Sequence, residues 1–200
     1  MSLFPMFLKL EGRHSLVVGA GKIAESKIES LLVTEARIHV VAPQVNDKIA
    51  GWARQKLINL NQREFQPSDL EGMFIAIAAT SSRDLNETIF REAQRRKVLC
   101  NAVDDPEHCH FYYPAVVRRG DLQIAISTAG RSPALAQRLR RELETQYRPE
   151  YADWVSQLGS IRENLFKVEE DPEKRRRLLH DMASREAFAA RNSVNQGEVQ

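Results

Sequence analysis

The chain has 200 residues, with 29 Lys and Arg against 27 Asp and Glu, and 42% of its residues are hydrophobic. This length allows one large or two small domains with a real core, and a formal net charge of +2 gives no argument for nucleic-acid binding. No signal-like segment leads the chain, and no apolar run approaches the roughly 18 residues of a membrane span, so we expect no membrane partner. Two cysteines are too few for a disulfide framework, and they favour a reducing cytoplasm.

The most informative stretch is residues 15–24, where a short apolar run leads into a Gly-x-Gly-x-x-Ala turn and then a helical pattern. A continuous apolar run is typical of a buried parallel strand. Gly19 permits a tight turn, Gly21 leaves room for a pyrophosphate, and the small Ala24 lets the next helix lie close to the sheet. A tight structural turn is the alternative, but the strand–turn–helix context favours nucleotide binding, with phosphates on the free N–H groups at the helix start. The predicted cofactor-binding residues of this turn are Gly19, Gly21, Lys22, Ile23 and Ala24.

Strands and helices continue to alternate after this turn. Helical patterns cover residues 23–33, a segment ending near 55, and a segment from the N-cap residues at 80–82 through Arg96. Strand patterns cover Arg37–Val41, a short stretch near 58–60, Phe74–Ala79 and Val98–Val103. Strands separated by helices of this length imply a parallel sheet with right-handed crossovers. Residues 1–112 are therefore predicted to form an NAD-binding Rossmann domain.

One common element of such a domain is missing. NAD-binding Rossmann domains often have Asp or Glu at the end of the second strand to bind the ribose hydroxyls, but this chain has Val-Ala-Pro-Gln at residues 41–44 and no arginine there for a 2′-phosphate. We expect the ribose to contact backbone groups and Gln44. NAD is the predicted cofactor, although this feature does not decide between NAD and NADP. Pro43, Gln44 and Thr80 complete the predicted cofactor site.

The pattern changes after the fifth strand. Residues 104–111 form a polar loop at the carboxyl end of that strand, the edge where open parallel sheets bind ligands. Ala115–Arg118 and Leu122–Ser127 predict an antiparallel hairpin, and Ser132 is the expected N-cap of a helix. The predicted fold is α/β: the Rossmann sheet, a small α+β dimerisation domain at 113–146, a C-terminal helical domain at 147–191 and a disordered tail at 192–200.

An ordered set of motifs resembles one known family. These are Pro5-x-Phe7, residues 17–24, Val41-Ala42-Pro43, Ala78-Ala79-Thr80 with Asn86, Asn101-Ala102-Val103-Asp104, Phe111-x-x-Pro114, and Ile126-Ser127-Thr128-x-Gly130-x-Ser132-Pro133. The chain resembles the precorrin-2 dehydrogenase/sirohydrochlorin ferrochelatase family of the siroheme-synthase N-terminal type. It departs from the family at Ala20, where a glycine is usual, and at Thr128, where some relatives have serine. With no methyltransferase module in the sequence, the stand-alone form is expected.

The resemblance implies that NAD accepts a hydride from precorrin-2, giving sirohydrochlorin, and that the chain forms a homodimer through 113–146. Asp104 matches the family's candidate general base; a turn cap before Pro106 is the alternative. Asp105 is expected to point elsewhere. The substrate carries eight carboxylates, which guanidinium groups bind well. The candidate substrate-binding residues are Arg118, Arg119, Arg131 and Ser132, whereas Arg138, Arg140, Arg141 and Arg148 also fit a solvated helix face.

Some family members also insert ferrous iron, so a bifunctional ferrochelatase is an alternative. His108, Cys109 and His110 are potential metal ligands, but too few ligands lie at zinc-finger spacing for a stable metal site. Transient iron handling by Asp104 with His108 or His110 is the remaining metal hypothesis, and Cys100 is expected to be a buried small hydrophobe. An alternative of another class is a non-catalytic NAD-sensing module, which would give no reason for Asp104 and the arginines of the hairpin.

Overall fold

The computed structural model describes residues 3–197, with side chains described through Arg191. The chain divides into two compact units, Met1–Tyr113 and Pro114–Gln200. Within the part of the chain that is described, no helix is both long enough and apolar enough to cross a membrane.

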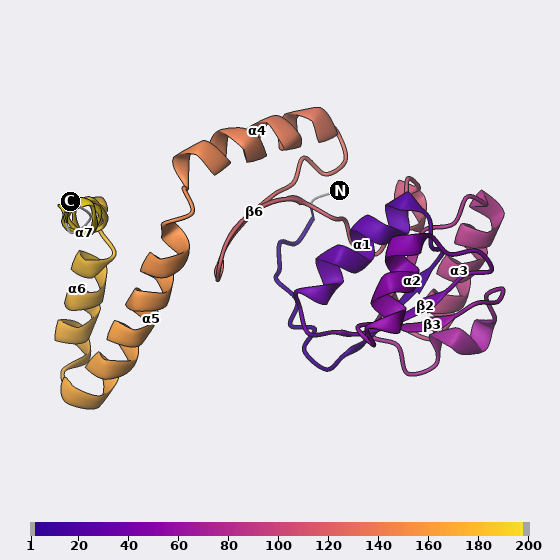
Figure 1. Cartoon of the computed structure of the whole chain (residues 1–200), viewed down its shortest axis with the longest axis horizontal. Coiled ribbons are helices and arrows are strands. Elements are labelled where there is room, and N and C mark those ends of the chain that lie inside the picture. Colours follow the sequence, from indigo (N-terminus) through magenta and orange to yellow (C-terminus); the bar gives the residue numbers. More distant parts are fainter. Residues whose placement is uncertain (1–2, 198–200) are drawn as a thin grey trace. The chain divides into compact units, whose positions relative to one another are not determined.

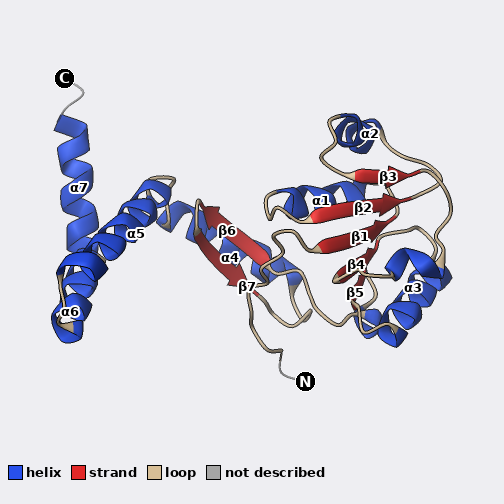
Figure 2. Ribbon diagram, turned by 90° about the horizontal axis from the view of Figure 1, so that it is seen from below, coloured by secondary structure: helices blue, strands red, loops and turns tan. Residues whose placement is uncertain are grey.

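Five parallel strands form the sheet of the first unit, in the order β3-β2-β1-β4-β5 (Figure 2). They are β1 (His14–Val18), β2 (Arg37–Val41), β3 (Asn59–Asn61), β4 (Ile75–Ala78) and β5 (Leu99–Ala102). Val18 pairs with Val41 and with Ala78, and Ala78 pairs with Ala102. The carboxyl ends of β2, β1, β4 and β5 therefore lie at one level, and the direction of strand addition reverses between β1 and β4.

Helices cover both faces of this sheet (Figure 1). The side chains of α1 (Lys22–Leu32) and α2 (Asp47–Arg54) pack in one apolar cluster with Val17, and those of α3 (Arg83–Arg95) pack in a second cluster with Leu16 and Val18. Alternate residues of β1 thus face opposite layers, which explains why its apolar run is continuous. The predicted α/β class with a parallel Rossmann sheet is confirmed.

The second unit begins with a two-stranded hairpin. Strands β6 (Ala115–Arg119) and β7 (Leu122–Ile126) pair in antiparallel register around a two-residue loop, in which Gly120 has φ +55°. A Cβ at Gly120 would lie 3.2 Å from the Cβ of Ala152, so the loop and the following helical segment are closely packed. The helices of this unit are α4 (Pro133–Gln146), α5 (Tyr151–Val168), α6 (Pro172–Met182) and α7 (Arg185–Gly197).

The end of the chain differs from the sequence prediction. The sequence predicts a disordered tail from Asn192, but α7 continues to Gly197; residues 198–200 lie outside the described residues. The hydroxyl of Ser184 accepts from the N–H of Ala187 and starts this helix. Extending a helix that has already started costs less free energy than nucleating one. The residues from Asn192 to Gly197 can therefore continue α7 although several of them are weak helix formers.

Candidate functional site

The predicted cofactor residues meet at the carboxyl edge of the sheet, next to the point where strand order reverses. In open α/β sheets this point is where dinucleotides bind. Gly19 follows β1 and donates its N–H to the Val41 carbonyl at 2.9 Å, while Ala79, which follows β4, donates to the Val18 carbonyl at 2.8 Å. Thr80 therefore lies on the turn adjacent to the glycine turn.

The two glycines of this turn have different requirements. Gly19 has φ +104°, and a Cβ there would lie 2.4 Å from the carbonyl oxygen of Ala79, so no other residue fits without displacing backbone. Gly21 has an extended backbone with φ −85°, and a Cβ there would meet no protein atom within 4 Å. The space at Gly21 is open to a ligand, which fits the phosphate-binding role predicted for it.

Gly21 is also the N-cap of α1. The first hydrogen bond of the helix runs from the N–H of Glu25 to the Gly21 carbonyl at 3.0 Å. The N–H groups of Lys22, Ile23 and Ala24 precede it, and such groups have no intrahelical acceptor and bind anions favourably. Ala24 is fully buried in the core, which brings α1 close to the sheet. These residues fit a dinucleotide pyrophosphate.

A buried carboxylate supports the start of α1. Glu25 accepts from Lys22 Nζ at 3.0 Å and from Asn46 Nδ2 at 2.9 Å, and Lys48 Nζ lies 3.3 Å from it. The hydrogen bond from Lys22, followed by that from Lys48, holds the pKa of Glu25 below its ordinary value. Asn46 is in turn the N-cap of α2, accepting from the N–H of Ile49. The network ties the first turns of two helices together, and the sequence analysis did not find it because its members are far apart in the chain.

The remaining cofactor residues predicted from the sequence lie on two loops of this edge. Pro43 and Gln44 are exposed in the loop after β2. The hydroxyl of Thr80 donates to Asn86 Oδ1 at 2.7 Å, and the Asn86 amide donates back to the Thr80 carbonyl at 3.2 Å. The buried Asn86 therefore fixes the turn after β4 from within α3, and the side chain of Thr80 is already bound to protein.

Asp104 and Asp105 occupy very different environments after β5. Asp104 is exposed and has φ +60°, a left-handed conformation that Asp adopts more readily than most residues. Asp105 is buried; it accepts from His108 Nδ1 at 2.8 Å and lies 3.5 Å from Arg83 Nε. The hydrogen bond from His108 is the main cause that holds the pKa of Asp105 below its ordinary value. The sequence predicts only that Asp105 points elsewhere, and the structure shows that its buried side chain fixes the loop.

The loop histidines and cysteine are also bound to protein. His110 Nδ1 accepts from the backbone N–H of Cys100 at 3.0 Å, and the His110 ring stacks on Phe90 at 4.7 Å. Cys109 Sγ donates to the Ala102 carbonyl at 3.1 Å. No group of three or more His, Cys, Asp or Glu able to hold a metal occurs among the described residues. The hypothesis that Asp104, His108 and His110 handle iron together therefore gains no support from the described residues.

The predicted substrate-binding residues lie in the second unit. Arg118 is exposed, with a long 3.5 Å hydrogen bond to Gln123. Arg119 donates to the carbonyls of Tyr147 and Glu144, at 2.7 and 3.1 Å, at the C-terminal end of α4. Its guanidinium caps that helix, so its predicted substrate role is not supported.

The other two predicted residues start α4. Arg131 is exposed, and Ser132 accepts from the N–H of Leu135 as N-cap, as the sequence predicts. Further along α4, Arg138 and Arg140 form ion pairs with Glu142 and Glu144. These pairs favour the solvated helix face that was the alternative for this helix.

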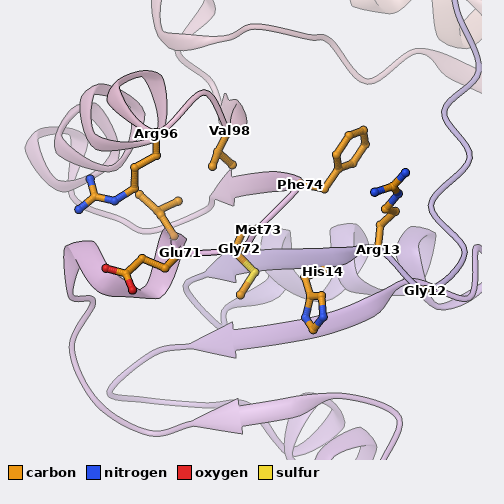
Figure 3. Close-up of a pocket in the computed structure, with 10 residues that line it drawn as sticks. Gly12, Arg13, His14, Glu71, Gly72, Met73, Phe74, Arg96 and Val98 are labelled. Atoms are coloured by element: carbon orange, nitrogen blue, oxygen red, sulfur yellow. The ribbon is translucent and has the colours of Figure 1, made fainter.

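A pocket of about 600 Å³ lies at the opposite, amino-terminal edge of the sheet (Figure 3). Gly12, Arg13 and His14 line one part of it, and Arg96 lines another. The basic side chains are engaged by protein: Arg13 lies over the Phe74 ring, the His14 ring bonds that of His39, and Arg96 pairs with Glu92. None of the predicted site residues lines this pocket.

The strand order, the Gly19 turn and the open space at Gly21 define a dinucleotide-binding Rossmann domain. Residues 6–115 match the family described as putative NAD(P)-binding, and residues 119–146 match the central domain of sirohaem biosynthesis proteins. The chain belongs to this NAD(P)-binding family, and the resemblance inferred from its motifs is confirmed.

Named relatives agree with this assignment. The chain is 35% identical to siroheme synthase 1 of Aeromonas hydrophila and 36% identical to the siroheme synthase of Photorhabdus laumondii, each match covering all of this chain and 43% of the relative. The chain thus spans less than half the length of these curated relatives. Among solved structures, it is similar to SirC, a precorrin-2 dehydrogenase, with a TM-score of 0.79 and 28% identity over 92% of this chain and 90% of that one.

Proposed function

We propose that this chain is an NAD-dependent precorrin-2 dehydrogenase that produces sirohydrochlorin. The observation that carries the proposal is the placement of a dinucleotide cradle at Gly19 and Gly21 and an exposed carboxylate, Asp104, on the same edge of one sheet. The similarity to a precorrin-2 dehydrogenase over nine-tenths of that structure supports the choice of substrate.

The chemistry divides between cofactor and protein. Bound NAD supplies a hydride acceptor. The helix start and the glycine turn bind the pyrophosphate, and Asn86 fixes the turn after β4 beside it. Loss of hydride leaves a cation that must lose a proton, and the Asp104 carboxylate accepts that proton as general base. Asp105 and His108 hold the Asp104 backbone in place from the buried side.

Two further properties belong to the proposal. We assign the protein to the cytoplasm because both cysteines, Cys100 and Cys109, are free thiols, which suits a reducing compartment. Ferrochelatase activity is not part of the proposal, and the iron and cobalt arms of the experiment below test it separately.

The deciding experiment incubates the protein with precorrin-2 and NAD, with NADP, iron and cobalt in separate arms. We expect NAD-dependent formation of sirohydrochlorin. Asp104→Asn keeps the side-chain shape but removes the basic charge, so we expect near-normal NAD binding with oxidation slowed by at least about two orders of magnitude. NAD binding without turnover in the wild type would favour the NAD-sensing module instead, and an Asp104→Asn variant of full activity would remove the general-base role.

A further inference from the structure

A lysine that the sequence analysis did not single out lies at this site. Lys27, on α1, is half-buried, and its Nζ lies 3.8 Å from the centre of the Tyr113 ring. An ammonium over an aromatic face is a favourable cation–π arrangement. Tyr113 itself is packed against the apolar core on the α1 side of the sheet. The ring therefore gives the Lys27 ammonium a favourable contact within the first unit.

Lys27 differs from the neighbouring lysines in its partners. Lys22 and Lys48 both pair with carboxylates, at 3.0 and 2.9 Å. Within the described residues, Lys27 Nζ has neither a carboxylate within 4 Å nor a hydrogen-bond acceptor, and the Tyr113 face is its sole contact of these kinds. An ammonium carries three donors, and a partly buried charge without an anionic partner is costly. The hydrogen-bond donors of Lys27 are thus available to an anion.

The charged groups near Lys27 include the proposed general base. Burial lowers the pKa of Lys27, and the nearby Asp104 and Cys109 oppose this effect by attraction. Lys27 is therefore within electrostatic reach of the proposed general base, although the two form no ion pair. It lies five residues beyond Lys22, on the order of 8 Å along the helix axis from the N–H groups that bind pyrophosphate.

We propose that Lys27 binds a carboxylate of the tetrapyrrole substrate beside Asp104. The inference rests on the proposed function, in which a substrate rich in carboxylates must approach a carboxylate base. Like charges at short range repel each other, and the Lys27 ammonium, which Asp104 attracts, offsets this repulsion. Tyr113 acts as a positioning residue, since its ring holds the ammonium while leaving the donors free. The dinucleotide phosphates are the other anion available, but they belong at the start of α1.

The test compares Lys27→Met and Lys27→Arg with the wild type and with Lys9→Met, a control at an exposed side chain. Sirohydrochlorin binding is measured by fluorescence titration without cofactor, NAD binding by calorimetry, and precorrin-2 oxidation by steady-state kinetics. For Lys27→Met we expect the sirohydrochlorin Kd and the precorrin-2 KM to rise about tenfold, the size expected for one charge-assisted hydrogen bond. We expect kcat to stay within about twofold and NAD affinity to be unchanged.

A charge-conserving variant and the salt dependence show whether the contact is ionic. Lys27→Arg restores the charge and should bind sirohydrochlorin within about threefold of wild type, and the Lys27→Met defect should shrink at high salt because the contact is ionic. Wild-type tetrapyrrole binding in Lys27→Met would overturn the inference, and so would a loss of NAD affinity without a change in sirohydrochlorin binding. In either case an active wild type leaves the proposed function standing. A wild type that neither binds nor oxidises tetrapyrrole would instead refute the proposed function, and this inference with it.

Discussion

The two glycines of the cofactor turn show how one residue type can serve two purposes in a single motif. Gly19 is required by the fold, because its left-handed backbone and the Ala79 carbonyl exclude any side chain. Gly21 is not required by the fold, because its backbone is extended and its surroundings are open. Substitutions at the two positions should therefore fail for different reasons.

We predict that Gly21→Val abolishes NAD binding with little change in stability, because its side chain occupies the space of the pyrophosphate. Gly19→Ala should lower the free energy of unfolding by about 2 kcal/mol or more, from backbone strain and overpacking. Urea unfolding measures this loss of stability, and calorimetric titration with NAD measures the loss of binding in Gly21→Val. Wild-type NAD affinity in Gly21→Val would disprove the assignment of this turn.

Asp105 supports a second prediction at this scale. The hydrogen bond from His108, with help from Arg83, lowers the pKa of Asp105. A carboxyl whose pKa is lowered on folding stabilises the protein above its unfolded pKa, and this contribution is lost as the pH falls through the folded-state value. Asp105→Asn should therefore unfold at lower urea concentration than wild type at pH 7, and the difference should narrow below about pH 4. Asp181→Asn, at an exposed position, is the control; a pH-independent difference would contradict the argument.

At the scale of elements, the strands and helix starts were predictable from local patterns. The apolar runs predicted each strand of the sheet within about two residues, and Ser82 and Ser132 cap α3 and α4 as expected. Hydrophobic period and capping chemistry depend on neighbours in sequence, so they can be read before the fold is known.

The parts of the site that could not be predicted depend on contacts across the fold. Lys27 meets Tyr113 and Glu25 meets Asn46 only after the sheet has formed. Asp105 and His108 are close in sequence, but the burial that makes their pairing structural is a property of the tertiary structure. The sequence does not indicate which charged side chains form ion pairs in the folded protein and which do not.

The contact between β1 and β2 leads to a pH-dependent prediction. His14 Nδ1 and His39 Nε2 are 2.8 Å apart, and burial, reinforced by His14, lowers the pKa of His39. The unfolded chain then binds a proton at a higher pH than the folded one, so stability falls as the pH drops below about 6.5. In His39→Gln the loss of stability between pH 7.5 and 5.5 should be smaller, as measured by urea unfolding. The control is His180→Gln, at an exposed position; equal losses in the wild type and His39→Gln would exclude this origin.

At the scale of the whole molecule, the hairpin of the second unit is the least complete element. Strands β6 and β7 form a sheet of two strands, so each has an edge without a strand partner within the described residues. A two-stranded hairpin is marginal alone, and open edges favour pairing with another chain.

We predict a homodimer built on residues 113–146, since pairing of this element under two-fold symmetry would cover the open edges. Sedimentation equilibrium at micromolar concentration should give a mass near twice the 22.8 kDa of one chain. A mass of one chain across a tenfold concentration series would count against the dimer.

The buried thiol of Cys100 can report on the opening of the fifth strand. Cys100 is inaccessible, and burial raises its pKa to about 12, while Cys109 has its thiol hydrogen-bonded to the Ala102 carbonyl. Alkylating reagents attack the thiolate, so Cys100 should react with them only during transient openings of the native protein, whereas the partly exposed Cys109 can also react in the closed state. The rate at which Cys100 is modified in excess reagent then measures how often β5 detaches from the sheet. A ligand that binds at this edge should slow the reaction, which gives a binding assay that requires neither turnover nor a coloured product.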